Sequence, residues 1–247
     1  MRTTPTRAGP PTIGRDSLVE ALDRATQRRV TVISAPPGSG KTFLLRAWRE
    51  RAGRERPIAA MSVRRAEADP QRFWLTMLNA IHAAVDPAGL VGSPTPTPEF
   101  DGSGIVDRVL AQLADAEEPP VITVDDLHEL ESVEALSQFE ELLTRLPPNV
   151  HVVLATRRDL RLRLHQLRLE GQLSELRTDD LRFSVSEAQA LLEASGVELD
   201  ADTMAALQER TEGWAAGLRL AAISLVGHPE PQQFVAAFSG TNRTIAD

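Results

Sequence analysis

A short β-branched segment runs directly into a loop that contains the only lysine of the chain. The segment covers residues 30–34, and the loop that follows reads Ala-Pro-Pro-Gly-Ser-Gly-Lys-Thr over residues 35–42. The chain has 27 basic residues, and every one except Lys41 is an arginine. An ammonium group is a compact point charge on a flexible side chain, and a planar guanidinium does not bind phosphate oxygens in the same way. We therefore interpret residues 30–52 as a strand, a phosphate-binding loop and a helix.

The spacing of this loop fits the P-loop pattern G-x-x-x-x-G-K-[ST] everywhere except at its first position, which is Ala35. Gly38 and Gly40 allow a tight turn, and the loop amides and the helix N-terminus after them attract phosphate. Thr42 is placed to ligate Mg²⁺ through its hydroxyl. The alternative is an ordinary Gly/Pro turn between a strand and a helix. The predicted nucleotide-binding residues of the loop are Pro36, Pro37, Gly38, Ser39, Gly40, Lys41, Thr42 and Phe43.

Short apolar segments alternate with amphipathic segments along the first three quarters of the chain. Strands are predicted at residues 30–34, 57–63, 121–124, 150–155 and 173–176, and helices at 17–27, 42–52, 70–81, 105–116 and 136–146. Ser17 is predicted to cap the first helix, and Asp69 the third, with Pro70 at its first position. Residues 86–104, rich in Pro, Gly and Ser, are predicted to form a surface loop. Alternation of strands and helices predicts an α/β fold with a parallel sheet covered by helices.

The pattern changes after Arg182, where only helical periodicity remains. Ser184 and Glu187 form a capping-box pattern, and helices are predicted at about 184–195, 201–211, 214–226 and 231–238. The sequence therefore predicts a P-loop nucleotide-binding domain over residues 1–182 and a small all-helical domain over residues 183–247.

Two acids follow the third predicted strand directly. In a parallel sheet, a carboxylate at the end of a neighbouring strand can hold Mg²⁺ through its water shell, and we assign this role to Asp125. Asp126 is predicted to orient or deprotonate the attacking water. The alternative is that both acids cap the next helix.

Arg157 follows the fourth predicted strand. Ligands of open α/β sheets bind outside the carboxyl ends of the strands, so this cation is predicted to sense the γ-phosphate as part of the catalytic site. The alternative is a solvated arginine in an arginine-rich stretch. His128 and His151 have no partner at metal-ligand spacing and are predicted to be structural, while Trp74 and Trp214 are predicted to be core residues.

Composition excludes several classes of protein. The absence of Cys excludes disulfides and thiolate chemistry, and no run of 18 apolar residues is present to span a membrane. A formal net charge of −8 disfavours direct nucleic-acid binding. A single lysine cannot supply both a P-loop and the N-K-x-D element that reads guanine, so adenine nucleotides are expected. A cytoplasmic location is expected.

Several segments together resemble the ATP-binding region of the large LuxR-type transcriptional regulators, a group related to the maltose regulon activator and to the signal-transduction ATPases with numerous domains (STAND). The matching segments are residues 34–42, the D-P-x-R-F-W element at 69–74, Asp125 to His128, the G-Q-L-x-E-L stretch from 171 to 183, and R-T-E-G-W-A-A-G-L at 210–218. Two departures are that the acid after Gly14 and Arg15 arrives late, at Glu20, and that Ala215 stands where many relatives have a proline.

The resemblance implies ATP or ADP with Mg²⁺ as ligands, and a role near the adenine for Arg15. It also implies that other domains of a longer regulator, beginning with a winged-helix module near residue 242, are partners, and that the protein self-associates in response to nucleotide. The function expected is therefore a weak ATPase used as a signal-responsive switch. Two alternatives stay open: a P-loop kinase for a small molecule, and an oligomeric remodelling ATPase.

Overall fold

The computed structural model describes residues 13–64, 69–85, 104–159 and 162–238, and these divide into two compact units. The αβ unit contains residues 17–36 and 41–177, and the helical unit contains residues 13–16, 37–40 and 178–238 within the described ranges. The tip of the predicted P-loop, Pro37–Gly40, therefore groups with the helical unit by its contacts. Most of the predicted surface loop at 86–104 lies outside the described residues.

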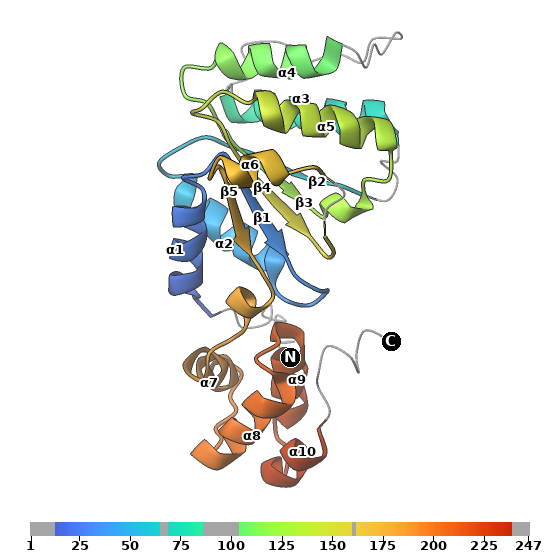
Figure 1. Cartoon of the computed structure of the whole chain (residues 1–247). Coiled ribbons are helices and arrows are strands. Elements are labelled where there is room, and N and C mark those ends of the chain that lie inside the picture. Colours follow the sequence, from blue (N-terminus) through green and yellow to red (C-terminus); the bar gives the residue numbers. More distant parts are fainter. Residues whose placement is uncertain (1–12, 65–68, 86–103, 160–161, 239–247) are drawn as a thin grey trace, which may run out of the picture. The chain divides into compact units, whose positions relative to one another are not determined.

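The αβ unit is built on a five-stranded parallel sheet (Figure 1). The strand order is β2-β3-β4-β1-β5. The strands are β1 (Val30–Ser34), β2 (Ile58–Ser62), β3 (Val121–Asp125), β4 (His151–Thr156) and β5 (Leu173–Leu176). All five lie where the sequence predicts strands, and the parallel pairing confirms the predicted α/β class.

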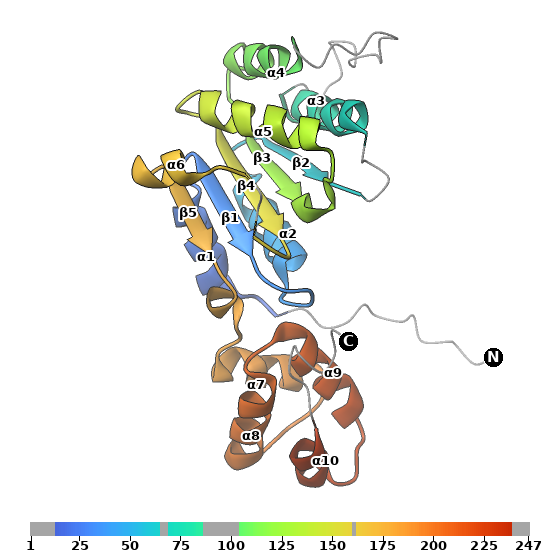
Figure 2. The same ribbon diagram turned by 45° about the vertical axis from the view of Figure 1, so that its right-hand side comes forward.

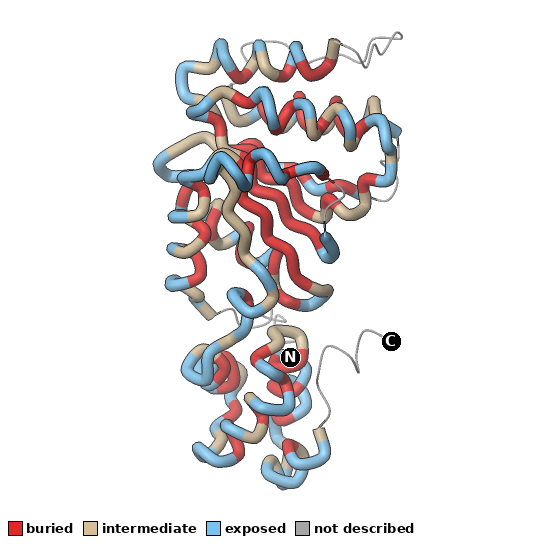
Figure 3. The backbone as a smooth tube through the Cα atoms, in the orientation of Figure 1, coloured by how far each residue is buried: buried red, intermediate tan, exposed pale blue. Residues whose placement is uncertain are grey.

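Burial of the strands follows their place in the sheet. Every residue of β1 and β3 is buried, and so are five of the six residues of β4, whereas the edge strands β2 and β5 are only partly buried (Figure 3). Central strands of a parallel sheet are covered on both faces, which is why their sequences are almost continuously apolar.

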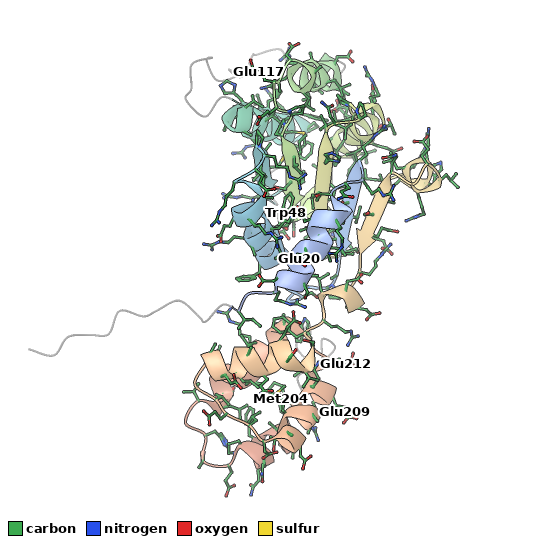
Figure 4. The ribbon with its side chains drawn as sticks, turned by 90° about the vertical axis from the view of Figure 1, so that its left-hand side faces the viewer. Glu20, Trp48, Glu117, Met204, Glu209 and Glu212 are labelled. Carbon is green, nitrogen blue, oxygen red and sulfur yellow. The ribbon has the colours of Figure 1, made fainter. Side chains whose placement is uncertain are left out.

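Helices cover both faces of this sheet (Figures 1 and 2). On one face, Thr31 donates a hydrogen bond to the carbonyl of Ala25 at the end of α1, and Trp48 of α2 is fully buried (Figure 4). On the other face, alternate strand residues join a core made with α3, α4, α5 and α6, in which Phe73, Trp74 and Phe139 make edge-to-face contacts. The helices are α1 (Asp16–Ala25), α2 (Lys41–Ala52), α3 (Pro70–Val85), α4 (Ile105–Ala114), α5 (Val133–Arg145) and α6 (His165–Leu169).

The helical unit packs four helices around its own apolar core, in which Met204 and Leu207 are buried (Figure 4). The helices are α7 (Val185–Ala194), α8 (Ala201–Thr211), α9 (Ala215–Leu225) and α10 (Pro231–Ala237). The predicted capping box is confirmed, since the Ser184 side chain accepts from the Glu187 amide while the Glu187 side chain accepts from the Ser184 amide.

One local prediction is wrong, and three short elements were not predicted. Ser17 lies inside α1, which begins at Asp16, so it is not the N-cap residue. The short helix α6 and the 3₁₀ turns η3 (Leu127–Glu129) and η4 (Asp179–Leu181) were not predicted, because three to five residues are too few to show helical periodicity. Within the described ranges, every helix is too short or too polar to cross a membrane.

Candidate nucleotide-binding site

Sheet topology brings three chemically important chain segments to one edge. Strands β3, β4 and β1 are neighbours and run parallel, so their carboxyl ends meet at the same edge of the sheet. The P-loop follows β1, Asp125 ends β3, and Arg157 follows β4. Two of these ends are joined directly, because the amide of Ala35 donates to the carbonyl of Thr156 at 3.2 Å.

The tip of the loop adopts the backbone that a phosphate cradle requires. Gly38 and Gly40 have φ angles of 72° and 86°, in the region that L side chains rarely adopt. Successive residues that alternate in this way turn their amides toward one concavity, which can hold an anion. The two glycines thus sit at the positions where the sequence predicts a tight turn.

Lys41 opens α2 with its side chain folded onto the loop. Its Nζ donates to the carbonyl oxygens of Ala35 and Pro36 at 2.5 and 2.8 Å, and the residue is 6% exposed. Burial, with the nearby Arg157, lowers its pKa to about 8, although Asp125 and Asp126 oppose this change. A desolvated ammonium of this kind gains free energy when an anion approaches it.

Asp125 lies at the end of β3 with only 8% of its surface exposed. Its Oδ1 accepts the amide of Asp126 at 2.9 Å, which fixes the carboxylate at the strand end. It is also close enough to Lys41 to influence that residue's pKa. The carboxylate is thus held beside the lysine at the sheet edge where Mg²⁺ is expected.

Asp126 combines a strained backbone with a loosely paired side chain. Its φ of 54° places it in the left-handed region, which is sparsely populated by residues other than glycine. Its Oδ1 lies 3.6 Å from Arg157 Nη2 and 3.9 Å from His128 Nδ1. Strain of this kind persists only where surrounding structure holds it, and it often accompanies a functional site.

His128 lies inside this acidic turn, a location that the predicted structural role did not anticipate. Its side chain is 5% exposed, and neither ring nitrogen has a well-formed hydrogen bond within the described residues. Glu129 Oε1 lies 3.3 Å from Nε2, and Arg158 donates to the His128 carbonyl at 3.4 Å. Burial lowers its pKa, and Arg157 adds to this effect against Asp126 and Glu129. The sequence signal was its position two residues after Asp126, which the η3 turn brings back toward the carboxylate.

Arg15, predicted from the family resemblance to lie near the adenine, uses its guanidinium within the helical unit. It pairs with Glu187 at 3.1 Å, donates to the carbonyls of Leu181 and Arg182 at 2.9 and 2.7 Å, and lies 4.2 Å from the Phe183 ring centroid. The structure therefore places Arg15 as a clamp between the segment before α1 and the start of α7.

The residues present fit a polyphosphate with Mg²⁺. Ser39 is 4% exposed, and its Oγ has no hydrogen-bond partner in the described part of the chain. A buried polar atom of the loop could therefore gain a hydrogen bond from a ligand. Thr42 and Phe43 are exposed at the start of α2. Among the described residues, no cluster of three or more His, Cys, Asp or Glu forms a metal cage. Mg²⁺ commonly takes one or two protein ligands and completes its shell with phosphates and water, as Thr42 and Asp125 would allow.

The prediction that both tryptophans are core residues is half right. Trp74 is fully buried, and its Nε1 donates to Gln138 at 2.6 Å. Trp214 is only partly buried and is the N-cap residue of α9, where its Nε1 donates to the carbonyl of Pro37 at 3.2 Å. The sequence predicts a helix that begins at residue 214, but α9 begins at Ala215, so Trp214 does not lie on a buried helix face.

Comparison with known sequences supports the assignment of a nucleotide-binding loop. The family model described as AAA ATPase domain matches residues 11–155, more than half of the 247 residues. The chain is 29% identical over 238 residues to the serine/threonine-protein kinase PknK of Mycobacterium tuberculosis, covering 94% of this chain and 21% of PknK. It is 25% identical over 236 residues to the HTH-type transcriptional regulator MalT of Serratia proteamaculans, covering 94% of this chain and 26% of MalT. The chain thus spans about a quarter of these relatives, and the predicted resemblance to regulators of the MalT type is confirmed.

Solved structures share the fold. A STAND protein with a tetratricopeptide-repeat sensor from Pyrococcus horikoshii superposes with a TM-score of 0.57 at 17% identity, covering 84% of this chain and 29% of that one. A Walker-type ATPase of Pyrococcus abyssi gives a TM-score of 0.55 at 12% identity, covering 88% and 69%. At these identities the comparison establishes the P-loop ATPase fold alone.

Proposed function

The chain belongs to the AAA ATPase domain family, and from this premise we propose that it is an ATP/ADP-binding switch module of a signal-responsive, LuxR-type transcriptional regulator. Hydrolysis would be slow and would reset the switch. The observation that carries the proposal is the buried Lys41 ammonium, held beside Asp125, Asp126 and Arg157 at the edge of a parallel sheet.

Binding rests on the loop and the two strand ends beside it. The amides of the loop between Pro36 and Thr42 would cradle the phosphates, and Lys41 would exchange its carbonyl contacts for phosphate oxygens. Thr42 and Asp125 would hold Mg²⁺, which supplies neutralisation of phosphate charge when bound. An adenine-side role for Arg15 competes with its existing contacts to Glu187 and to two carbonyls.

Hydrolysis rests on Asp126 and Arg157. The left-handed backbone of Asp126 presents its carboxylate beyond the end of β3, where it can orient a water and accept its proton. Arg157, 46% exposed and only 3.6 Å from Asp126, is free enough to exchange this contact for a γ-phosphate oxygen. Loose pairing of the two groups suits a switch that turns over slowly.

The two matched relatives favour a switch over a kinase. PknK and MalT differ in their named activities, yet each aligns over 94% of this chain. We expect a segment that a protein kinase and a transcriptional regulator share to carry nucleotide-dependent control rather than either named activity. Recognition of DNA or of a protein substrate would then belong to other parts of such proteins, in a cytoplasmic location.

Lys41→Ala tests the proposal. We expect wild-type protein to gain about 2.7 kcal/mol of stability at an ADP concentration 100-fold above its Kd. The variant should lose this gain while its nucleotide-free melting temperature stays equal or rises, because a desolvated charge is removed. Thermal melts with and without Mg-ADP measure both effects.

Arg46→Ala is the matched control, since it removes an exposed cation from the same helix. It should respond to ADP as wild type does. Equal stabilisation of the Lys41 variant and wild type would refute nucleotide binding at this loop.

A further inference from the structure

The start of α9 holds the tip of the P-loop by two hydrogen bonds within the helical unit. Trp214 Nε1 donates to the carbonyl of Pro37 at 3.2 Å, and the amide of Ala216 donates to the carbonyl of Gly38 at 3.0 Å. Trp214 is the N-cap residue of α9 but provides no side-chain cap. The Gly38 carbonyl therefore satisfies one of the amides that the first turn of a helix leaves without an intrahelical partner.

The loop tip at Gly38 packs closely against Trp214 and Ala216 at the start of α9. A Cβ added to Gly38 would lie 2.7 Å from Ala216 Cβ and 2.8 Å from Trp214 Cζ2. Gly38 thus needs to be glycine for two reasons, its φ of 72° and the indole and methyl groups against its Cα. The loop tip and the start of α9 are fitted to each other.

These contacts decide which way the loop amides point. In a trans peptide group the carbonyl and the following N–H lie in one plane and point in opposite directions. When Trp214 and Ala216 hold the carbonyls of Pro37 and Gly38, the amides of Gly38 and Ser39 are directed away from α9. Two donors of the phosphate cradle are oriented in this way before any ligand arrives.

We propose that Trp214 is a positioning residue for polyphosphate binding, acting through the carbonyl that its indole N–H holds. The inference deepens the proposed function and rests on it, since it assumes that the loop binds the phosphates of a nucleotide. The buried, unpartnered Ser39 hydroxyl lies in the same oriented tip. Nucleotide binding and the seating of the α9 start are then coupled, because one set of peptide groups serves both.

Trp214→Phe tests this role, because phenylalanine keeps a smaller aromatic ring near Gly38 and has no N–H donor. The positioning contributes at most one neutral hydrogen bond, about 0.5–1.5 kcal/mol, so Mg-ADP should bind about two- to twelvefold more weakly. Trp74→Phe is the matched control, since it also deletes an indole donor, to Gln138 in the core of the αβ unit. Titration calorimetry with Mg-ADP and nucleotide-free thermal melts are measured for wild type and both variants.

The expected pattern is weaker ADP binding by the Trp214 variant and wild-type ADP binding by the Trp74 variant, although each variant loses a hydrogen bond of the nucleotide-free protein. A Trp214 variant with wild-type affinity, or with a lowered melting temperature as its only defect, would overturn the positioning role. Wild-type protein that binds no ADP would instead overturn the proposed function itself, so the two failures are distinguishable.

Discussion

The Lys41 cluster (Lys41, Asp125, Asp126 and Arg157) and the Arg15 clamp (Arg15, Glu187 and the segment 181–183) both combine cations with carboxylates, in different units. In the clamp, Arg15 uses Nε and both terminal nitrogens in bonds of 2.7 to 3.3 Å, and its plane covers Phe183. In the Lys41 cluster, Arg157 Nη2 lies 3.6 Å from Asp126 Oδ1, and Lys41 donates to carbonyls rather than to either acid.

We infer that the difference separates charges that stabilise a fold from charges that can still gain a ligand. Saturated groups such as Arg15 and Glu187 have little to gain from a further partner, whereas half-satisfied groups in a buried setting do. The backbone agrees, since Asp126 is left-handed in the Lys41 cluster. Burial, incomplete pairing and backbone strain together support the proposed nucleotide-binding role of the Lys41 cluster more strongly than charge alone does.

Asp126→Asn should have the largest effect of any substitution in the Lys41 cluster. Asparagine tolerates the left-handed backbone and keeps the shape of the side chain, but it cannot accept a proton. We expect hydrolysis of bound ATP to slow by about 100-fold or more, while ADP affinity stays within about twofold of wild type. Single-turnover measurements with a stoichiometric amount of ATP provide the rate.

Asp159→Asn serves as the control, because it neutralises an exposed carboxylate that pairs with Arg177. If the Asp126 variant hydrolysed ATP as fast as wild type, Asp126 would be a structural turn residue.

Arg15→Ala and Arg157→Ala test the difference between the Arg15 clamp and the Lys41 cluster through protein stability. Removing Arg15 leaves the largely buried Glu187 carboxylate without its cation, and should cost about 2–3 kcal/mol of unfolding free energy. Removing the half-exposed Arg157 should cost less than about 0.5 kcal/mol and should affect hydrolysis instead. Chemical denaturation followed by circular dichroism gives both values, and equal losses in the two variants would erase the distinction.

The last prediction concerns the pH dependence of ADP binding at Lys41. Phosphate favours the charged ammonium and raises its pKa in the complex, so above pH 8 binding requires uptake of a proton. Affinity for ADP should therefore fall as pH rises through about 8, by up to about tenfold per pH unit. Calorimetry between pH 7 and pH 9.5 measures the slope.

The nucleotide-free protein should show the opposite trend. The pKa of Lys41 is lower in the folded protein than its ordinary value of 10.5, so the unfolded chain binds more protons between pH 8 and 10.5. Stability should then rise with pH in that window, and Lys41→Arg, which stays protonated, should abolish the trend.

For the binding experiment, an ADP affinity of the wild-type protein that does not change between pH 7 and pH 9.5 would show that Lys41 does not contact the phosphates.

Much of this could be predicted from local patterns. Neighbouring residues in the chain were enough to predict the conformation or position of three features: the strand at residues 30–34, the glycines at 38 and 40, and the acids at 125 and 126. The short η3 turn and α6 could not be predicted, because their lengths carry no periodicity. The prediction that Trp214 is a core residue was wrong because its helix begins one residue later, and the structure shows that its indole N–H binds the carbonyl of Pro37.

The α/β class, the P-loop pattern, the helical periodicity after Arg182 and the family could all be predicted from the amino-acid sequence, since they depend on periodicity, turn chemistry and short motifs. Tertiary packing was needed to show that Arg15 is engaged by Glu187, that His128 lies against two acids, and that α9 holds the loop tip. These facts depend on pairs of residues up to 177 positions apart. No local pattern encodes which distant groups meet, because packing chooses among many partners of similar chemistry.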